Sequence, residues 1–356
     1  MKRKVRYVMI GFGGIAENRV AREGFACDRR RFRPLSNAEL VGATDLNPAR
    51  RAAVEKLGLR WYGSLEEALA DSGIGAIYIA TNNRSHVPLA MECLKAGKHV
   101  IVEKPIATSV ADAKKLSAFA KRKGLSLAVN HMMVHNAWHL AAKSVMDTKR
   151  LGTVNDCCFH MEFAFGYDPA EAKTWRCNNV AEMGGPIGDV ASHCFSVAES
   201  MFGKKIVKVA SVYYPKLMKT KAEDGAYIRF HFEDGLQGSV RAAFCEKRGG
   251  LAGTITNLGF EVYGDKAAMR GYGTMFQLSG YADEPVVQRV EIDDGRQVIA
   301  LKPKKIRNLY QSVIENHAAS VITKRPLSGR DAMHNLALCM AAHESARKGG
   351  KLIVVK

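Results

Sequence analysis

Apolar positions in the first third of the chain switch repeatedly between two spacings. Short continuous or alternating runs are predicted strands, at residues 5–10, 39–44, 76–80, 99–102 and 125–130. Segments with a helical period lie between them, at residues 49–57, 64–70, 86–96 and 109–122. Strands that alternate with helices indicate βαβ units and a parallel sheet. We therefore predict an α/β domain over residues 1–130.

The pattern beyond residue 150 consists of longer alternating runs. Predicted strands occupy residues 154–165, 207–214, 226–232, 237–244 and 260–263, with turn signals at 233–235 and 264–265. Alternation of this kind is typical of antiparallel strands that bury one face. Two helical segments follow, at residues 306–323 and 329–348. We predict an α+β domain with a large, mostly antiparallel open sheet over residues 131–356.

Composition limits the class of protein. The chain has 356 residues, of which 47% are hydrophobic and 25% charged, and this balance excludes disorder. Its longest apolar runs are far shorter than the roughly 18–20 residues of a membrane span. Eight cysteines are scattered without a Cys-x-x-Cys pair, which indicates reduced thiols and a cytoplasmic protein.

The formal net charge of +18 raises the question of a nucleic-acid partner. The basic residues are dispersed, except for Arg29, Arg30, Arg31 and Arg33 in a segment that looks like an insertion. Only Phe32 offers a ring for base stacking there. We interpret the segment as a solvated loop and expect no nucleic-acid or membrane partner.

The first predicted strand runs directly into Gly-Phe-Gly-Gly-Ile-Ala at residues 11–16, and a helix follows. This is the G-x-G-x-x-G/A arrangement, in which glycines permit a tight turn and a close approach to a pyrophosphate. The helix N-terminus adds free N–H groups and a positive dipole. The expected dinucleotide-binding residues of this turn are Gly11, Gly13, Gly14, Ile15 and Ala16.

Asp45 ends the second predicted strand, where an acidic residue binds the ribose hydroxyls of a dinucleotide. A carboxylate there repels a 2′-phosphate, so the sequence favours NAD over NADP. Arg50 and Arg51 could compensate that charge, which keeps NADP as the alternative.

Four later segments resemble one family. They are Ile-Ala-Thr-Asn-Asn-Arg-Ser-His at 79–86, Ala-Gly-Lys-His-Val-Ile-Val-Glu-Lys-Pro at 96–105, the stretch from Trp-Arg at 175 to Gly-Asp-Val-Ala-Ser-His at 188–193, and Pro-Leu-Ser-Gly-Arg-Asp at 326–331. In this order and spacing they are similar to the glucose–fructose oxidoreductase, inositol dehydrogenase and rhizopine catabolism (Gfo/Idh/MocA) oxidoreductase superfamily. The resemblance covers nearly the whole chain. It implies a Rossmann dinucleotide-binding domain joined to an α+β substrate domain, and a homodimer or homotetramer formed through the open sheet.

The resemblance also implies roles for individual residues. Glu103 would lie beside the nicotinamide, and Lys104 would be the lysine of the Glu-Lys-Pro motif. The other expected cofactor-binding residues are Thr81, Asn82, Asn83, His86, Lys104 and Asn130. The expected catalytic residues are Lys104, Asp189 and His193. The expected substrate-binding residues are Lys104, His131, Trp175, Arg176, Asp189 and His193.

Asp189 and His193 are four residues apart and would share one face of a helix. In the reaction that we predict, His193 takes the proton of a secondary alcohol, Lys104 stabilises the developing alkoxide, and hydride passes to nicotinamide. The reverse assignment of Lys104 and His193 remains open. The sequence departs from the family pattern at Met183, which stands where its first glycine is usual, at Ala191, and in the segment 130–135.

His131, His135 and His139 follow one another at intervals of four, which on a helix would place them on one face. No glutamate is interleaved as in His-Glu-x-x-His, so we predict the polar lining of a sugar pocket and no metal.

Three other functions compete with an NAD(P)-dependent dehydrogenase that acts on the CH–OH group of a sugar, polyol or cyclitol. One is a redox-neutral enzyme that retains NAD, one is a non-catalytic nucleotide sensor on the same fold, and one is a nucleic-acid binder. The presence of Lys104, Asp189 and His193 disfavours the sensor.

Overall fold

The computed structural model describes residues 4–246, 258–272 and 288–355. Two compact units are present and each is described by itself. Unit 1 comprises Met1–Met132 and Arg307–Met333, and unit 2 comprises Met133–Ile306 and His334–Lys356. The segment Arg307–Met333 thus groups with unit 1, whereas the sequence pattern assigned it to the domain 131–356.

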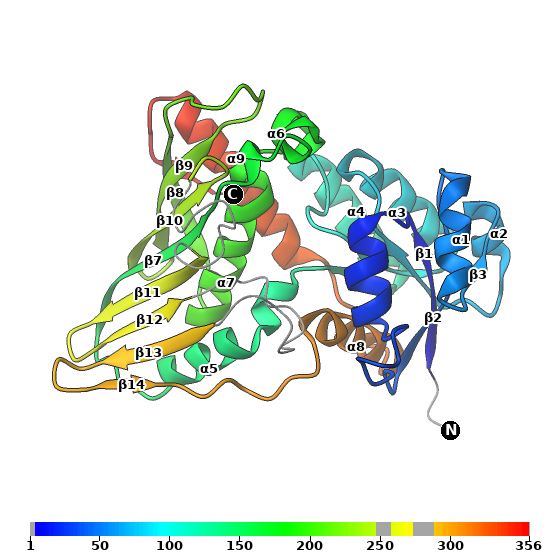
Figure 1. Cartoon of the computed structure of the whole chain (residues 1–356), viewed down its shortest axis with the longest axis horizontal. Coiled ribbons are helices and arrows are strands. Elements are labelled where there is room, and N and C mark those ends of the chain that lie inside the picture. Colours follow the sequence, from blue (N-terminus) through cyan, green and yellow to red (C-terminus); the bar gives the residue numbers. More distant parts are fainter. Residues whose placement is uncertain (1–3, 247–257, 273–287, 356) are drawn as a thin grey trace. The chain divides into compact units, whose positions relative to one another are not determined.

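A six-stranded parallel sheet forms the centre of unit 1, in the order β3-β2-β1-β4-β5-β6. Strands β1, β2 and β3 of this sheet are labelled in Figure 1. The strands are β1 (Val5–Ile10), β2 (Ala38–Thr44), β3 (Arg60–Trp61), β4 (Ala76–Ile79), β5 (His99–Val102) and β6 (Leu127–Val129). The chain order reverses between β1 and β4, and α/β proteins bind ligands at the carboxyl ends of the strands at such a switch point. The predicted Rossmann domain is confirmed.

The helical segments predicted in unit 1 are found within a few residues of their predicted bounds. Ser64 Oγ accepts a hydrogen bond from the Glu67 N–H at 3.2 Å, and Ser109 Oγ accepts one from the Asp112 N–H at 3.1 Å. Gly124 ends α4 in the left-handed conformation, with φ of 66°. The helices are η1 (Ala16–Gly24), η2 (Pro48–Arg50), α1 (Arg51–Lys56), α2 (Leu65–Ala70), η3 (Asn83–Ser85), α3 (His86–Lys95), α4 (Val110–Lys123) and α8 (Leu309–Ile322).

Helix α8 belongs to unit 1 because buried polar pairs and apolar contacts attach it to the parallel sheet. The Tyr7 hydroxyl and His317 Nδ1 are 2.7 Å apart, and the hydroxyls of Ser126 and Ser320 are 2.6 Å apart. Burial lowers the pKa of His317 to about 3, so its ring is neutral at physiological pH. A Cβ added to Gly24 in η1 would lie 3.0 Å from Ile314, which shows how closely the two helices pack.

The arginine-rich segment is a loop with apolar anchors. Phe32 and Leu35 are buried, whereas Arg29, Arg30 and Arg33 are exposed. Buried anchors hold the backbone of the loop against unit 1 while its charges face solvent, as expected for a solvated loop.

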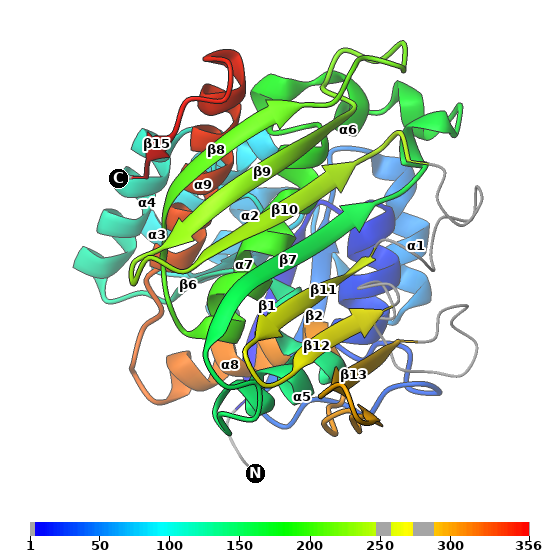
Figure 2. The same ribbon diagram turned by 90° about the vertical axis from the view of Figure 1, so that its left-hand side faces the viewer.

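Unit 2 contains a nine-stranded sheet in the order β14-β13-β12-β11-β7-β10-β9-β8-β15 (Figure 2). The strands are β7 (Val154–Glu162), β8 (Ile206–Tyr213), β9 (Gly225–Phe232), β10 (Gln237–Ala243), β11 (Leu258–Gly264), β12 (Ala268–Tyr272), β13 (Arg289–Asp293), β14 (Val298–Ala300) and β15 (Ile353–Val354). Neighbouring strands are antiparallel except β7 and β10, which are parallel. The prediction of a mostly antiparallel sheet is confirmed.

Helices cover one face of this sheet. Phe202 at the end of α7 packs on Phe232 of β9 with ring centroids 4.9 Å apart, and α5 packs against β12 and β13. The helices of unit 2 are η5 (Phe165–Tyr167), η6 (Glu171–Lys173), α5 (Ala137–Met146), α6 (Trp175–Asn178), η7 (Val180–Glu182), η8 (Ile187–Ala191) and α7 (Ser192–Phe202). Helix α9 (Arg330–Arg347) begins in unit 1 and continues in unit 2, and η4 (Met132–His135) joins the units.

The opposite face, which we call the open face, carries no helix of the described part of unit 2 (Figures 1 and 2). Large apolar side chains are exposed on it, namely Val212 at 50%, Tyr227 at 42% and Val354 at 58%. Among the described residues, no helix is both long enough and apolar enough to cross a bilayer.

Candidate active site

The glycine-rich turn connects β1 to η1 at the carboxyl edge of the parallel sheet. Gly11 has φ of +83°, and a Cβ added to it would lie 2.6 Å from the carbonyl oxygen of Ala80, the residue after β4. By contrast, a Cβ added to Gly13 or Gly14 meets no heavy atom of the described chain within 4 Å. Gly11 is therefore required by the fold, whereas Gly13 and Gly14 border open space.

Asp45 supports this turn. Its Oδ2 accepts a hydrogen bond from the Phe12 N–H at 2.6 Å, and its Oδ1 accepts one from the Asn47 N–H at 2.8 Å. The side chain is partly accessible. The carboxylate thus holds the glycine-rich turn in place next to the position predicted for the ribose.

The two arginines that could have compensated Asp45 have partners elsewhere. Arg50 donates from Nε to the Phe12 carbonyl at 2.6 Å and from Nη2 to Glu17 at 2.5 Å, while Arg51 pairs with Glu55 at 2.8 Å. Burial of Glu17 opposes its ionisation, but hydrogen bonds from Arg50 and a second arginine outweigh that effect and lower its pKa. Both guanidinium groups are therefore occupied by carboxylates.

The loop after β4 and the Glu-Lys-Pro segment after β5 are tied together by His86. Its Nδ1 lies 2.8 Å from the Pro105 carbonyl oxygen and its Nε2 lies 3.3 Å from the Thr81 carbonyl oxygen. The peptide bond between Lys104 and Pro105 is cis. His86 and Asn83 are buried, whereas Thr81 is partly exposed and Asn82 is exposed. The buried side chains of His86 and Asn83 thus anchor this loop, while Thr81 and Asn82 remain accessible to solvent.

Glu103 is locked in place by two neighbours. Its Oε1 accepts hydrogen bonds from the Tyr78 hydroxyl at 2.7 Å and from Asn130 Nδ2 at 2.9 Å. Burial raises the pKa of Glu103, although these hydrogen bonds and the charge of Lys104 oppose the shift. Tyr78 lies inside an apolar strand, and no pattern in the sequence identified it as a partner of this carboxylate.

The predicted residues of unit 1 meet at one edge of the sheet. Gly11 follows β1, Thr81 follows β4, Lys104 follows β5 and Asn130 follows β6. Parallel strands end on the same side, so these residues line the carboxyl edge across the switch point.

In unit 2, Asp189 and His193 lie on one continuous helical segment, as predicted, but its first part is a π-helix. Asp189 belongs to η8 and His193 to α7. Short π-helical segments are frequent at functional sites. Asp189 Oδ2 lies 3.5 Å from Arg176 Nε, and the Arg176 guanidinium stacks 4.9 Å from the Trp175 ring centre. The structure therefore brings three of the predicted substrate residues together.

The turn before η8 explains two sequence features. Met183 adopts a left-handed conformation with φ of 60°, which suits the glycine that the family pattern has at this position. Its side chain is buried. Gly185, with φ of 89°, leaves room for the Glu223 carboxylate, because an added Cβ would lie 2.4 Å from its oxygens.

Glu223 is a residue of this region that sequence reasoning missed. Its Oε1 accepts a hydrogen bond from the Ile187 N–H at 3.0 Å and so caps the segment that carries Asp189. Burial raises its pKa from 4.5 to about 7, against the lowering effects of the Ile187 N–H and of Lys216. It lies in a loop without periodicity, so no sequence signal pointed to it.

We expect the contribution of Glu223 to the free energy of unfolding to decrease as pH rises. Because the pKa of Glu223 is higher in the folded chain, its contribution to stability is full below pH 4.5 and is lost as pH rises through about 7. Relative to Glu223→Gln, the wild type should lose about 3 kcal/mol between these limits. Urea unfolding of both proteins at several pH values measures the difference. A difference that stays constant with pH would contradict the prediction.

The three histidines expected on one helical face are not arranged in that way. η4 ends at His135, and Asn136 is extended, with ψ of 136°, before α5 begins. Its side chain caps α5 by accepting from the N–H groups of Trp138 and His139. His139 is buried, with Nε2 3.1 Å from the Ser200 hydroxyl, and burial lowers its pKa to about 3. An N-cap asparagine thus breaks the helix that the spacing had implied.

Comparison with known proteins gives matches to two parts of the chain. Residues 5–131 match the family described as an oxidoreductase family with an NAD-binding Rossmann fold. Residues 139–270 match the GFO/IDH/MocA C-terminal domain.

Individual proteins are similar over most of the chain. The 1,5-anhydro-D-fructose reductase of Ensifer adhaerens is 27% identical over 296 residues, 80% of this chain and 81% of that protein. The aldose-aldose oxidoreductase of Caulobacter crescentus, in complex with glycerol, has a TM-score of 0.83 at 22% identity, covering 99% of this chain and 100% of the other. A putative NADPH-dependent oxidoreductase of Desulfitobacterium hafniense has a TM-score of 0.84 at 19% identity, covering 99% and 98%. The two solved structures share the fold.

Proposed function

Because the chain belongs to the GFO/IDH/MocA family of oxidoreductases, we propose that it transfers hydride between a secondary alcohol of a sugar, polyol or cyclitol and a nicotinamide dinucleotide. The observation that carries this proposal is the edge of the parallel sheet. There Lys104 follows β5 beside a Glu103 that Tyr78 and Asn130 hold, on the same edge as the glycine-rich turn. Hydride transfer requires a group that stabilises the reacting oxygen next to a dinucleotide-binding turn, and Lys104 and the glycine-rich turn lie on the same edge of the sheet at the switch point.

NAD is the cofactor that we propose, with NADP as the alternative. The space at Gly13 and Gly14 fits a pyrophosphate, and Asp45 fits a ribose that carries free hydroxyls. Arg50 and Arg51 are held by carboxylates, which leaves less positive charge for a 2′-phosphate. Against this, one protein of the same fold is described as NADPH-dependent. When bound, the nicotinamide ring would supply the two-electron acceptor.

We assign the following roles to the chain's own residues. His193 takes the hydroxyl proton of the substrate, and Lys104 donates a hydrogen bond to the developing alkoxide. Asp189, held by Arg176 at 3.5 Å, orients His193 or binds a neighbouring hydroxyl. Lys104 belongs to unit 1 and the other three to unit 2.

The substrate class follows from the side chains proposed around it. His131, Trp175 and Arg176 combine a ring for stacking on a sugar face with donors for several hydroxyls. The Ensifer relative is named as a reductase of an anhydro sugar, which agrees with this class.

The experiment that tests the function is a panel of sugars, polyols and cyclitols with NAD and with NADP, followed by the absorbance of the reduced nicotinamide. We expect turnover with at least one polyhydroxylated substrate and a preference for NAD. Tightly bound dinucleotide without net reduction would favour the redox-neutral enzyme. No turnover and no dinucleotide binding would overturn the proposal.

We also propose that copies of the chain associate through the open face. Exposed apolar side chains there, Val212, Tyr227 and Val354, support a homodimer or homotetramer. Light scattering after size-exclusion chromatography measures the assembly.

All eight cysteines are free thiols, which supports the expectation of a cytoplasmic location.

A further inference from the structure

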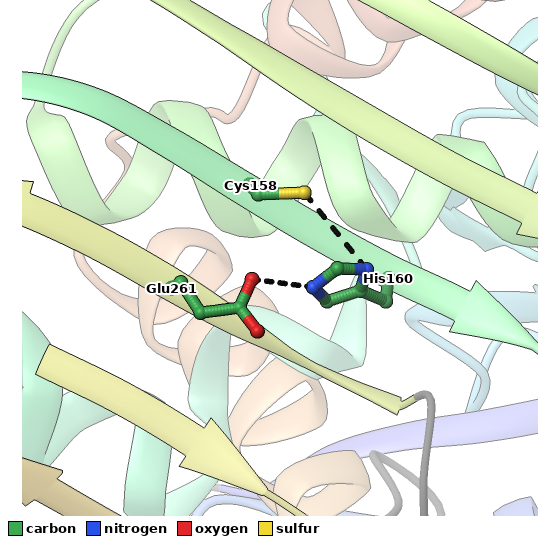
Figure 3. A group of neighbouring side chains, drawn as sticks. All are labelled: Cys158, His160 and Glu261. Carbon is green, nitrogen blue, oxygen red and sulfur yellow. Dashed lines mark hydrogen bonds and ion pairs between the residues drawn. The ribbon is translucent and has the colours of Figure 1, made fainter.

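Three side chains with metal-binding chemistry meet on the open face of unit 2. Cys158 and His160 are two residues apart on β7 and so point to the same side of the sheet. Glu261 lies on the neighbouring strand β11, directly opposite Cys158 in the antiparallel register. Figure 3 shows the imidazole of His160 joined by one dashed line to the thiol and by another to the carboxylate. None of the three belongs to the residues proposed for catalysis.

The side of the sheet follows from the register. Phe159 pairs with Val240, which pairs with Ile228, and Ile228 shares a face of β9 with Phe232. Phe232 packs against helix α7. Phe159 therefore faces the helices, and its neighbours Cys158 and His160 face the other way.

The donor atoms are close and only slightly exposed. His160 Nε2 lies 2.6 Å from Glu261 Oε2, and Cys158 Sγ lies 3.8 Å from His160 Nδ1. One ligand atom from each residue can be chosen so that all three lie within 4.8 Å of one another. Cys158 is 8% exposed, and the side chains of His160 and Glu261 are 13% and 27% exposed. A sulfur, a nitrogen and an oxygen donor thus lie close enough together to bind one metal ion.

A hydroxyl group of the neighbouring strand lies next to the sulfur of Cys158. Ser239 on β10 is paired with Cys158, and its hydroxyl donates to Cys158 Sγ at 3.1 Å. A donor of this kind is what the outer shell of a metal site supplies to a thiolate ligand. Strand β7 is hydrogen-bonded to β10 on one side and to β11 on the other, so the sheet holds all four residues at fixed spacing.

We propose that Cys158, His160 and Glu261 form a binding site for a divalent cation of intermediate softness, with Zn²⁺ as the best match. Zn²⁺ takes thiolate, imidazole and carboxylate ligands together, whereas Mg²⁺ and Ca²⁺ prefer oxygen alone. Three protein ligands leave a fourth position for water. The cation replaces the contact between His160 and Glu261, since one imidazole nitrogen becomes its ligand and the ring turns toward the other two donors.

Binding should stabilise unit 2. The ligands come from two strands that are about 100 residues apart in sequence, so the unfolded chain does not hold them together. A cation that binds only the folded chain raises the free energy of unfolding. This effect does not depend on the proposed hydride transfer, and its readout is separate from activity.

The test begins with protein freed of metal by a chelator and titrated with Co²⁺ and with Zn²⁺. We expect one cation per chain, a thiolate-to-cobalt charge-transfer band, displacement of Co²⁺ by Zn²⁺, and a higher Tm with Zn²⁺. Cys158→Ser should abolish the band. His160→Gln and Glu261→Gln should each weaken Zn²⁺ binding by at least about tenfold, the lower end of the loss seen when outer-shell partners are removed.

Two matched variants serve as controls. Cys27→Ser removes a partly exposed thiol of unit 1, and His231→Gln removes an imidazole from β9 in the same sheet. Both should bind Zn²⁺ like the wild type. Absence of saturable binding by the wild type, or unchanged binding by Cys158→Ser and His160→Gln, would overturn the proposal.

A second measurement on the wild type covers the case in which a variant fails to fold. Zn²⁺ should slow alkylation of Cys158 by iodoacetamide, mapped by mass spectrometry, while Cys27 reacts at an unchanged rate. Equal rates at Cys158 with and without Zn²⁺ would also overturn the site.

Discussion

Replacing Lys104 by alanine should lower kcat by about 10²- to 10⁴-fold while NAD binding stays close to that of the wild type. Lys104 is the cationic residue of the Glu-Lys-Pro segment, held at the edge of the sheet by the loop that His86 ties down. Loss of its ammonium group removes stabilisation of the alkoxide in the transition state. The dinucleotide keeps the glycine-rich turn and Asp45, so its affinity depends little on this lysine. Steady-state kinetics and a fluorescence titration of NAD measure the two quantities.

Lys95→Ala is the matched control, because Lys95 is an exposed lysine at the end of α3 in the same unit. Its kcat should equal that of the wild type. A Lys104→Ala enzyme with wild-type kcat would refute the catalytic role. His193→Asn completes the experiment, since the variant that loses the acidic limb of the pH–kcat profile identifies the base. Loss of the acidic limb in Lys104→Ala, with that limb retained in His193→Asn, would reverse the two roles.

Gly13→Val should weaken NAD binding by at least about tenfold, or 1.4 kcal/mol, without lowering Tm. A side chain at this position meets no described atom of the chain within 4 Å, so the fold accommodates it. It occupies the space that we assign to the pyrophosphate. Isothermal titration with NAD and a thermal unfolding curve measure both effects.

Gly11→Ala, in the same turn, should lower the stability of the fold, in contrast to Gly13→Val. An alanine there meets the Ala80 carbonyl at 2.6 Å and must adopt φ of +83°. The left-handed conformation alone costs about 1–2 kcal/mol, and the backbone clash adds to it. Tm should therefore fall clearly in this variant. Equal NAD affinity in Gly13→Val and the wild type would contradict the assigned pyrophosphate position.

Local sequence signals predicted the elements of unit 1 closely. The spacing of apolar residues placed β1 and β5 at the observed bounds, and Ser64 and Ser109 marked helix starts that their hydroxyls cap. These features depend on residues within a few positions of one another. The prediction that failed, a helical face shared by His131, His135 and His139, also concerned local structure. Spacing alone did not reveal that Asn136 adopts an extended cap conformation there.

The sequence motifs indicate candidate site residues, but they do not indicate the side chains that hold those residues in place. The motifs indicated Glu103, Lys104 and Asp189, whereas Tyr78 and Glu223 emerged only from the structure. In the sequence, Tyr78 resembles the other residues of an apolar strand. Its hydroxyl reaches Glu103 because β4 and β5 are neighbouring strands. Glu223 caps η8 from a loop more than 30 positions away, where no periodic pattern relates the two.

By itself, the sequence determined the alternation of strands and helices over residues 1–130, the run of longer strands after residue 150, and the glycine-rich turn between β1 and η1. Each of these is encoded in short stretches by side-chain period, caps and glycine placement. Only the tertiary structure decided that Arg307–Met333 joins unit 1, that β7 pairs in parallel with β10, and that Cys158, His160 and Glu261 share one space. These arrangements arise from strand pairing and buried contacts between residues far apart in the chain, and a local pattern carries no information about such partners.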